Sequence, residues 1–376
     1  MKASTRRITP VFWAFAIVCS LAAFISIFCA LSPSEEWGGI SLFRSVTKIS
    51  KIAIGGEGQD TLPTTRQNQT DEQGTGVKLE TKPPGKSEEE LEQEEQEDED
   101  EDRPLILYAY HDTPNAYENA QFFITHGLHA EADFIFILNG ETTLAGSIPT
   151  DKPNIKVVQR NNTCFDLGAH AEVLVDNDME LIKKYKRFIL MNASIRGPFL
   201  PTWSRECWSD AFFGKIDEKN KLVGLSFNCQ PTRHVQSMLL ATDSTGLSLL
   251  LPKINKCFKT LESAVGGETS LTSAIISGGY TVNALMTAFS SYKSYQNTCT
   301  HGDLLYDGLY YGITMHPYEG MFQKANRDNA PDVLERLTEW TDGSGYESWG
   351  VCARARNVRK AVRMMRKKGS LLDFGI

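Results

Sequence analysis

The chain has 376 residues, a formal net charge of −8 and 41% hydrophobic residues, an average balance for a globular protein. Much of the negative charge lies before residue 103, so the rest of the chain is close to neutral and lacks the basic surface that binds nucleic acid. We therefore expect no nucleic-acid partner. The roughly 270 residues after this acidic part suffice for one large domain with a substantial core.

Residues 10–31 form the first predicted element, because no charged residue interrupts this apolar run. At about 1.5 Å of rise per residue, a helix of roughly 22 residues covers a hydrocarbon core of about 30 Å, which predicts a transmembrane signal-anchor. Basic residues precede the run and Glu35 and Glu36 follow it, so residues 1–9 should form a cytosolic tail. The alternative is a cleaved secretory signal, although its apolar part usually runs only about 7 to 15 residues. The anchor predicts a single-pass type II protein of the Golgi or endoplasmic reticulum membrane.

Residues 32–103 are rich in Gly, Gln, Thr, Pro and Glu and show little apolar periodicity. In the closing run, Glu88–Asp102, every residue is acidic except Leu91, Gln93 and Gln96. Such a segment cannot bury enough apolar surface to offset its ordering entropy, so we expect a disordered acidic stem. Binding of a cation or a basic partner by the acidic run is the alternative to simple extension by charge repulsion.

Short apolar runs alternate with helical segments after Pro104, a pattern typical of an α/β fold with a mainly parallel sheet flanked by helices. A helix is predicted after the first strand, with Asn115 as its cap and Glu118 three positions on. Asp166 is expected to begin another helix, and a basic helix should close a domain that spans residues 104–376. The predicted strands are Leu105–Tyr110, Asp133–Leu138, Asn154–Gln159, Arg187–Met191 and Lys221–Phe227.

Polar residues follow the predicted strands at the point where each strand ends. They are His111, Asn139, Arg160 with Asn161, and Asn192 with Ser194. Because ligands of parallel α/β sheets bind at the carboxyl ends of the strands, we expect these residues to converge on one site. Arg160 could donate charge-assisted hydrogen bonds to a phosphate, which the N-terminus of the Asp166 helix would also favour. Turns after strands are also rich in Asn and Asp for conformational reasons, so each residue alone has a structural explanation.

Six cysteines lie beyond the apolar run: Cys164, Cys207, Cys229, Cys257, Cys299 and Cys352. An even number in a chain sent to an oxidising compartment predicts disulfides, but six cysteines allow 15 pairings and the sequence does not choose among them. The cysteines form no C-x-x-C pair and no His-x-x-x-His spacing accompanies them, so we do not expect zinc.

A series of motifs runs in order between Arg103 and Asn326. It consists of the segments 158–169 (VQRNNTCFDLGA), 185–199 (YKRFILMNASIRGPF) and His234–Ser237, the residue Glu268, and the segments His316–Tyr318 and Phe322–Lys324. The series resembles the rhamnan synthesis protein F family of glycosyltransferases, and within it the membrane-anchored eukaryotic members. The resemblance implies a nucleotide-sugar (GT-A-like) transferase fold and an enzyme that transfers a sugar from a nucleotide sugar to a glycan or glycoprotein acceptor.

The chain departs from that family in one motif. Where the family has Asn-Asp-Ser, this sequence has Asn192-Ala193-Ser194, so the aspartate that could hold a divalent ion is absent. A manganese or magnesium cofactor would be weakened, and no metal site is assigned. Activity would then be metal-independent, depend on His316 and Glu141, or be lost.

In a glycosyl transfer with inversion, a carboxylate takes the proton of the acceptor hydroxyl, although the sequence leaves open whether the transfer is inverting or retaining. Glu268 is the first choice for this base, at the start of a helix predicted over Ser270–Ile276, and Asp243 is the second. An ordinary first-turn acidic residue is the alternative for Glu268. The expected donor-binding residues are His111, Asn139, Arg160, Asn161, Asp166, Asn192, Ser194, His234 and Gln236.

A protein without activity is the alternative class. A lumenal scaffold or a carbohydrate-binding protein on the same fold would tolerate the alanine at position 193. A hydrolase is not indicated, because the sequence has neither a Gly-x-Ser-x-Gly nor a His-Glu-x-x-His motif.

Overall fold

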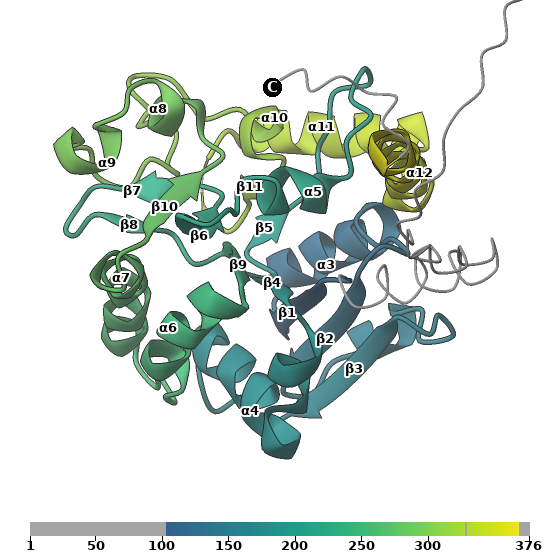
Figure 1. Cartoon of the computed structure of the whole chain (residues 1–376), viewed down its shortest axis with the longest axis horizontal. Coiled ribbons are helices and arrows are strands. Elements are labelled where there is room, and N and C mark those ends of the chain that lie inside the picture. The colour runs from purple at the N-terminus through teal and green to yellow at the C-terminus, as the bar shows by residue number, and fades with distance from the viewer. Residues whose placement is uncertain (1–102, 328, 368–376) are drawn as a thin grey trace, which may run out of the picture. The chain divides into compact units, whose positions relative to one another are not determined.

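The structure is a computed structural model, described here for residues 103–327 and 329–367 (Figure 1). Within these residues, no helix is both long and apolar enough to cross a membrane. The predicted anchor over residues 10–31 and nearly all of the predicted stem lie outside the described part.

A sheet of seven strands forms the centre of the described part, in the order β10-β6-β9-β4-β1-β2-β3. All of its strands run parallel to one another except β9, which is antiparallel to both of its neighbours. The prediction of an α/β fold with a mainly parallel sheet is therefore confirmed. The strands are β1 (Leu105–His111), β2 (Asp133–Asn139), β3 (Ile155–Arg160), β4 (Arg187–Asn192), β6 (Asn220–Gly224), β9 (Leu239–Asp243) and β10 (Thr281–Ala284).

The strand predicted over Lys221–Phe227 is divided in the structure. The parallel strand β6 ends at Gly224, and β7 (Phe227–Asn228) pairs antiparallel with β8 (His234–Val235). The β7–β8 pair can pack closely against the end of β6 because residue 224 is glycine. A Cβ atom at this position would lie only 2.1 Å from the Val235 side chain and would clash with it. A second small pair joins β5 (Ile195–Arg196) to β11 (Gln323–Lys324). Both pairs contribute residues to the walls of the candidate site.

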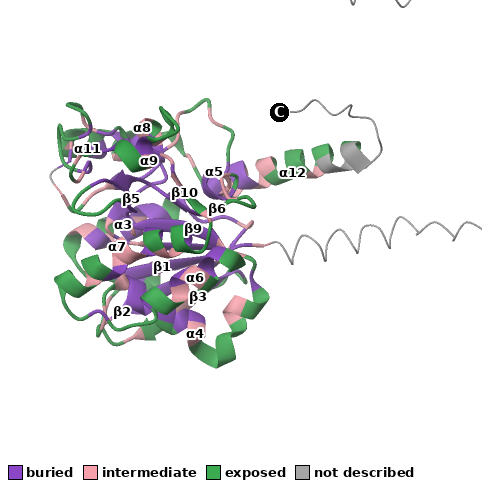
Figure 2. Cartoon of the chain, turned by 60° about the vertical axis from the view of Figure 1, so that its left-hand side comes forward, coloured by how far each residue is buried: buried purple, intermediate pink, exposed green. Residues whose placement is uncertain are grey.

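Helices cover both faces of the sheet. Figure 2 shows α4 (Asp166–Lys184) and α6 (Ser244–Ile254) on one side of β1, with α3 (Pro114–His126) and α5 (Trp208–Phe213) on the other. The remaining helices are η1 (Leu144–Ser147), α7 (Leu261–Ser277), α8 (Thr287–Ser290), α9 (Tyr295–Thr298), α10 (Pro317–Gly320), α11 (Pro331–Ser344) and α12 (Ser348–Lys367). The basic helix α12 extends away from the sheet.

The cap predicted for the first helix is wrong by two residues. Thr113, not Asn115, caps α3, and its hydroxyl accepts the Ala116 N–H at 3.1 Å while Pro114 occupies the first turn. Proline suits this position because its missing N–H has no helical partner there. Asn115 instead donates to the carbonyl of Ala325, 2.8 Å away. This bond ties α3 to the segment after β11.

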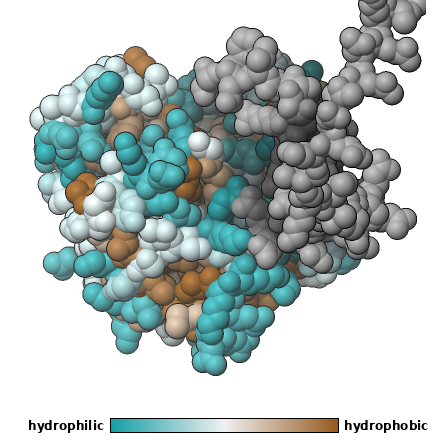
Figure 3. All heavy atoms as spheres, in the orientation of Figure 1, coloured by the Kyte–Doolittle hydropathy of each residue, from teal (hydrophilic) through white to brown (hydrophobic). Residues whose placement is uncertain are grey.

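Aromatic rings fill the space between the sheet and α3. The Tyr108 ring stacks on Phe123 with centroids 4.9 Å apart, and Trp208 meets Phe123 edge-on at 5.8 Å. All three side chains are almost completely buried. In the coloured part of the face drawn in Figure 3, hydrophilic and neutral residues predominate, and hydrophobic residues form separate patches. The core is thus formed mainly by apolar residues of the strands, which are covered by helices on both faces of the sheet.

All six expected cysteines are paired in the structure, in agreement with the predicted disulfides. The pairs are Cys164–Cys257, Cys207–Cys352 and Cys229–Cys299. The first joins the loop before α4 to the loop after α6, and the second joins α12 to the residue before α5. These links close long loops, which limits the freedom of the unfolded chain.

Candidate functional site

A cavity of about 930 Å³ opens at the carboxyl edge of the sheet. We call it the carboxyl-edge cavity. Its walls come from the ends of β1, β2 and β4, the start of α4, the β7–β8 hairpin, α7 and the segment after β11. The polar residues that line it include His111, Asn139, Asp166, Asn192, Ser194, His234, Gln236, Glu268, Asp303, Lys324 and Arg327.

Most of the predicted site residues meet in this cavity, because parallel strands bring their carboxyl ends to the same edge. His111, Asn139, Asn192 and Ser194 lie at or just after three neighbouring strands. Asp166, His234, Gln236 and Glu268 join them from other elements. Arg160, Asn161 and Asp243 do not line the cavity.

The expectation that the Arg160 side chain faces the cavity is wrong. Its side chain is only 7% exposed and pairs with the carboxylate of Glu172. The guanidinium also donates to the Asn139 side-chain oxygen and, at 3.2 Å, to the Thr163 hydroxyl. Arg160 therefore holds Asn139 in position, while Asn161 is exposed outside the cavity. The sequence placed Arg160 at the correct strand end but could not indicate the direction of its side chain.

Asp243 lies at the opposite edge of the sheet. It ends β9, and because β9 is antiparallel, Asp243 pairs with Arg187 at the start of β4. Its carboxylate caps α6 by accepting the Gly246 N–H at 2.8 Å and binds the Lys221 ammonium at 2.6 Å. The structure thus removes Asp243 as a candidate base and gives it a structural role.

A chain of hydrogen bonds crosses the floor of the cavity from Asp166 to Lys324. The Asn192 amide donates to the Asp166 carboxylate, and the Asn192 oxygen accepts the Ser194 N–H at 3.0 Å. The Lys324 ammonium donates to the Ser194 hydroxyl at 2.7 Å. Because β5 and β11 pair next to this chain, Lys324 is held beside the end of β4.

Glu268 lies well inside α7, which begins at Leu261 and is capped by Thr260. The expected helix start near Ser270 is therefore wrong, and stabilisation of Glu268 by a first-turn helix dipole does not apply. One carboxylate oxygen of Glu268 accepts the Ser237 N–H at 2.6 Å. The other lies 4.0 Å from Nε2 of His234, whose Nδ1 lies 2.6 Å from the Thr232 carbonyl oxygen. Because a carbonyl can only accept, Nδ1 carries a proton and Nε2 faces Glu268.

Asp303 and Arg327 also line the cavity, and the sequence analysis did not find them. Their side chains form an ion pair, and the Gln236 amide donates to Asp303 at 3.2 Å. The Arg327 guanidinium lies 4.6 Å from the centre of the Tyr306 ring. Both charged residues come from irregular segments, where no apolar periodicity marks a position. Lys324 ends the motif Phe322–Lys324, from which the sequence predicts no specific role.

His316 and Glu141 do not belong to this cavity. His316 is exposed and caps the short helix α10, where its Nδ1 accepts the Tyr318 N–H at 3.2 Å. Glu141 is exposed in the loop after β2. Because neither residue lines the cavity, the structure gives no support to the expectation that either one replaces the missing aspartate.

Buried charge shapes the electrostatics of the cavity. Burial lowers the pKa of the Lys324 ammonium, and the nearby Arg327 cation lowers it further. The carboxylates of Asp166, Glu268 and Asp303 act in the opposite direction. The poorly solvated ammonium of Lys324 would be stabilised by a ligand anion placed beside it, whereas the carboxylates of the cavity would repel an anion placed near them.

The residues around Ala193 offer few oxygen atoms to a divalent ion. The Ala193 carbonyl accepts the Asn119 amide at 2.9 Å, and the Asn192 oxygen already accepts the Ser194 N–H and hydroxyl. Asp166 is the carboxylate nearest to this point in the hydrogen-bond chain, and each of its oxygens also accepts a bond. Divalent ions prefer several oxygen ligands, so this set fits them poorly.

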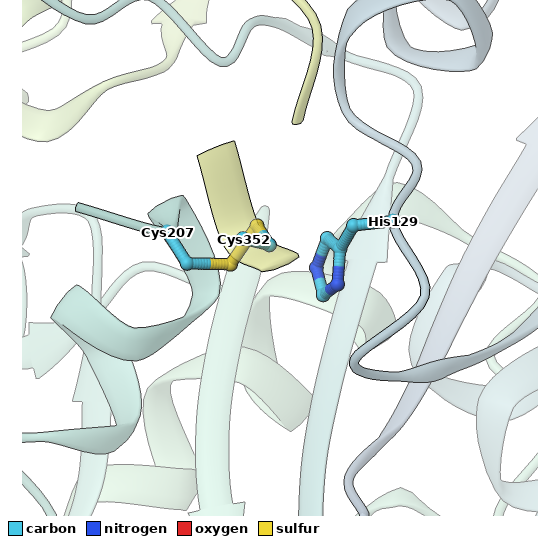
Figure 4. Close-up of side chains that lie close together, drawn as sticks. All are labelled: His129, Cys207 and Cys352. Carbon is cyan, nitrogen blue, oxygen red and sulfur yellow. A yellow bond between two sulfur atoms is a disulfide. The ribbon is translucent and has the colours of Figure 1, made fainter. Parts of the chain in front are cut away.

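A second group of metal-ligating side chains lies away from the cavity. His129, Cys207 and Cys352 place their ligand atoms within 4.8 Å of one another (Figure 4). The two sulfur atoms are bonded to each other, so neither is available as a thiolate ligand. Burial lowers the pKa of His129 to about 3. This group is a packed disulfide beside a neutral imidazole.

No protein-family model matches the chain, and no curated protein matches it. Among solved structures, it is similar to the mannosyltransferase PcManGT from Pyrobaculum calidifontis, with 13% identity, a TM-score of 0.34 and coverage of 48% of this chain and 54% of that one. It is also similar to the glycosyltransferase GlyE of Streptococcus pneumoniae, with 10% identity, a TM-score of 0.37 and coverage of 66% and 65%. A cytidylyltransferase from Leptospira borgpetersenii has 8% identity, a TM-score of 0.31 and coverage of 49% and 75%. The chain spans about half the length of the mannosyltransferase. Similarity at this level does not identify an activity.

Proposed function

We propose that this chain is a glycosyltransferase that moves a sugar from a nucleotide-sugar donor to a hydroxyl group of a glycan or glycoprotein acceptor. One observation carries the proposal. A single cavity at the carboxyl edge of the sheet contains both a carboxylate, Glu268, and a half-buried ammonium, Lys324. Its volume of about 930 Å³ lies within the range of small-molecule binding sites.

Glycosyl transfer needs a negative group near the acceptor hydroxyl and a positive group near the diphosphate that leaves. A carboxylate takes the proton of the acceptor hydroxyl as oxygen attacks the sugar, and a positive group stabilises the diphosphate that leaves. Glu268 is assigned the first role because the Ser237 N–H fixes its orientation in the cavity. The cationic side chains on the side of β11 are assigned the second. His111 and Asn139, at the ends of β1 and β2, are assigned contacts with the donor.

The proposed fold assignment is a GT-A-like nucleotide-sugar fold, and the proposed family is that of rhamnan synthesis protein F. The motif order in the sequence and the convergence of the motif residues Asn192, His234 and Glu268 in one cavity support this assignment. The proposed location is the Golgi or endoplasmic reticulum membrane in type II orientation. The apolar residues 10–31 and the paired cysteines support that location, because disulfides persist in oxidising compartments.

Nucleotide-sugar binding and turnover test the proposed function. The full-length protein, purified in detergent, is mixed with uridine, guanosine and cytidine diphosphate sugars, with and without manganese, and binding and release of the nucleoside diphosphate are measured. Saturable binding with release in the presence of an acceptor glycan is the expected result. Binding of glycans without any binding of nucleotide sugar would instead indicate the carbohydrate-binding alternative. Binding of neither would indicate a scaffold.

Protease protection in sealed vesicles tests the proposed orientation. Residues after the predicted anchor should resist a protease added from the cytosolic side and become sensitive once detergent opens the vesicles. Digestion of the large domain in intact vesicles would contradict a type II orientation.

A further inference from the structure

We propose that the Lys324 ammonium binds the donor diphosphate and supplies the positive charge that a divalent ion would otherwise provide. The inference rests on the proposed function, since it assumes that a nucleoside diphosphate occupies the carboxyl-edge cavity. It assigns Lys324 a binding role in that reaction.

The first argument is that the Lys324 ammonium already lies beside Ser194, where a divalent ion would otherwise bind. The Ser194 hydroxyl, one residue after the Ala193 position where the family motif has its aspartate, accepts a hydrogen bond from the Lys324 ammonium at 2.7 Å. Ala193 contributes no side-chain oxygen, and its carbonyl is bonded to Asn119. A divalent ion placed here would therefore meet a like charge and an incomplete set of oxygen ligands.

The second argument is that the backbone holds Lys324 firmly in this place. β11 pairs antiparallel with β5, so that Lys324 lies opposite Ile195. The following residue, Ala325, donates its N–H to the Ser194 carbonyl at 2.9 Å and accepts the Asn115 amide at 2.8 Å. A cation fixed before the substrate arrives stabilises negative charge without reorganisation during the reaction.

The third argument is that the Lys324 ammonium has N–H donors left for a ligand. An ammonium group has three N–H donors, and in residues 103–327 and 329–367 the Lys324 ammonium donates only to Ser194. The neighbouring carboxylates have other partners, because Asp303 pairs with Arg327 and Glu268 accepts the Ser237 N–H. The cavity therefore presents an ammonium with free donors, which suits phosphate oxygens.

The experiment measures binding of UDP, GDP and CDP to the full-length protein by calorimetry, in EDTA and in manganese. Wild-type protein should bind at least one of them in EDTA, and manganese should change its affinity little. Lys324→Met, which removes the charge but keeps much of the side-chain length, should weaken that binding about ten- to hundredfold. Lys253→Met is the matched control, because Lys253 is exposed on α6 and does not line the cavity.

The set of outcomes separates failure of this inference from failure of the proposed function. Binding by wild-type protein only in manganese would overturn the inference and leave the proposed function intact, as would unchanged metal-free binding by Lys324→Met. Absence of binding in both conditions would overturn both. The comparison of EDTA with manganese uses wild-type protein alone, so it remains decisive if Lys324→Met fails to fold.

Discussion

The Glu268 carboxylate lies 4.0 Å from the Nε2 atom of His234 and uses its other oxygen to accept the Ser237 N–H at 2.6 Å. Two elements distant in sequence, the β7–β8 hairpin and α7, thus fix one carboxylate in the cavity. A base held in this way needs no rearrangement before it accepts a proton. The relationship gives the proposed transferase its most direct test.

Glu268→Gln should lower kcat by roughly 10²- to 10⁴-fold while the affinity for the nucleotide sugar changes little, because the amide keeps the shape but cannot accept the proton. Steady-state turnover and calorimetric binding, measured on the same preparation, check this. Glu262→Gln is the control, since Glu262 is exposed in the first turn of the same helix. Normal turnover by Glu268→Gln would remove Glu268 as the base.

Asp243→Ala should destabilise the protein without changing ligand binding. The substitution removes the cap of α6 and leaves the Lys221 ammonium, whose side chain is only 11% exposed, without its carboxylate. We expect the free energy of unfolding to fall by about 2–4 kcal/mol. Chemical denaturation measures the loss, and nucleoside diphosphate binding at a permissive temperature should match wild type. A specific loss of binding would show that Asp243 serves the site after all.

Removal of the Cys164–Cys257 disulfide should weaken ligand binding as well as stability, because the loops that it joins contribute Thr163, Phe165 and Phe258 to the cavity wall. The double variant Cys164→Ser/Cys257→Ser should lose about 2–4 kcal/mol of stability. Calorimetry and thermal unfolding measure the two effects.

The matched control is the double variant Cys207→Ser/Cys352→Ser, whose disulfide does not line the cavity. The sequence separations of the two pairs are 93 and 145 residues, so their chain-entropy contributions differ by only about 0.4 kcal/mol. Equal effects of both double variants on ligand affinity would contradict a specific role for the first disulfide.

Stability should fall as pH decreases from 7 to 5, in part through His170. Burial lowers the pKa of His170 to about 4 from its ordinary value of 6.5, and the Asp166 charge opposes this only in part. The unfolded state therefore binds more protons between these pH values, and stability is lost as pH falls, with a slope that approaches about 1.4 kcal/mol per pH unit only below pH 6.5.

His170→Gln removes that proton uptake, so the difference in unfolding free energy between pH 7 and pH 5 should shrink by about 2 kcal/mol. Urea denaturation of both proteins at both pH values measures it, and any pH-independent cost of the substitution cancels in the comparison. An unchanged difference would mean that His170 titrates normally in the folded protein.

The buried strands could be predicted from the sequence alone. Continuous apolar runs such as Leu105–Tyr110 and Asp133–Leu138 report burial on both faces of a sheet, and they correspond to β1 and β2 within a residue. Parallel packing then implies that the residues after them share one edge. For this reason the sequence alone predicts that His111, Asn139 and Asn192 share one site.

What the sequence could not determine depends on contacts between distant segments. The antiparallel direction of β9 took Asp243 to the far edge, and the ion pair with Glu172 turned Arg160 away from the cavity. Lys324 and Asp303 entered the site from short or irregular segments, which carry no periodic signal. By itself the sequence determined the buried strands β1, β2 and β4 to within a residue, because burial on both faces of a sheet leaves a local apolar pattern. Only the tertiary structure decided strand direction, side-chain orientation and cysteine pairing, because these are set by which distant parts of the chain pack together.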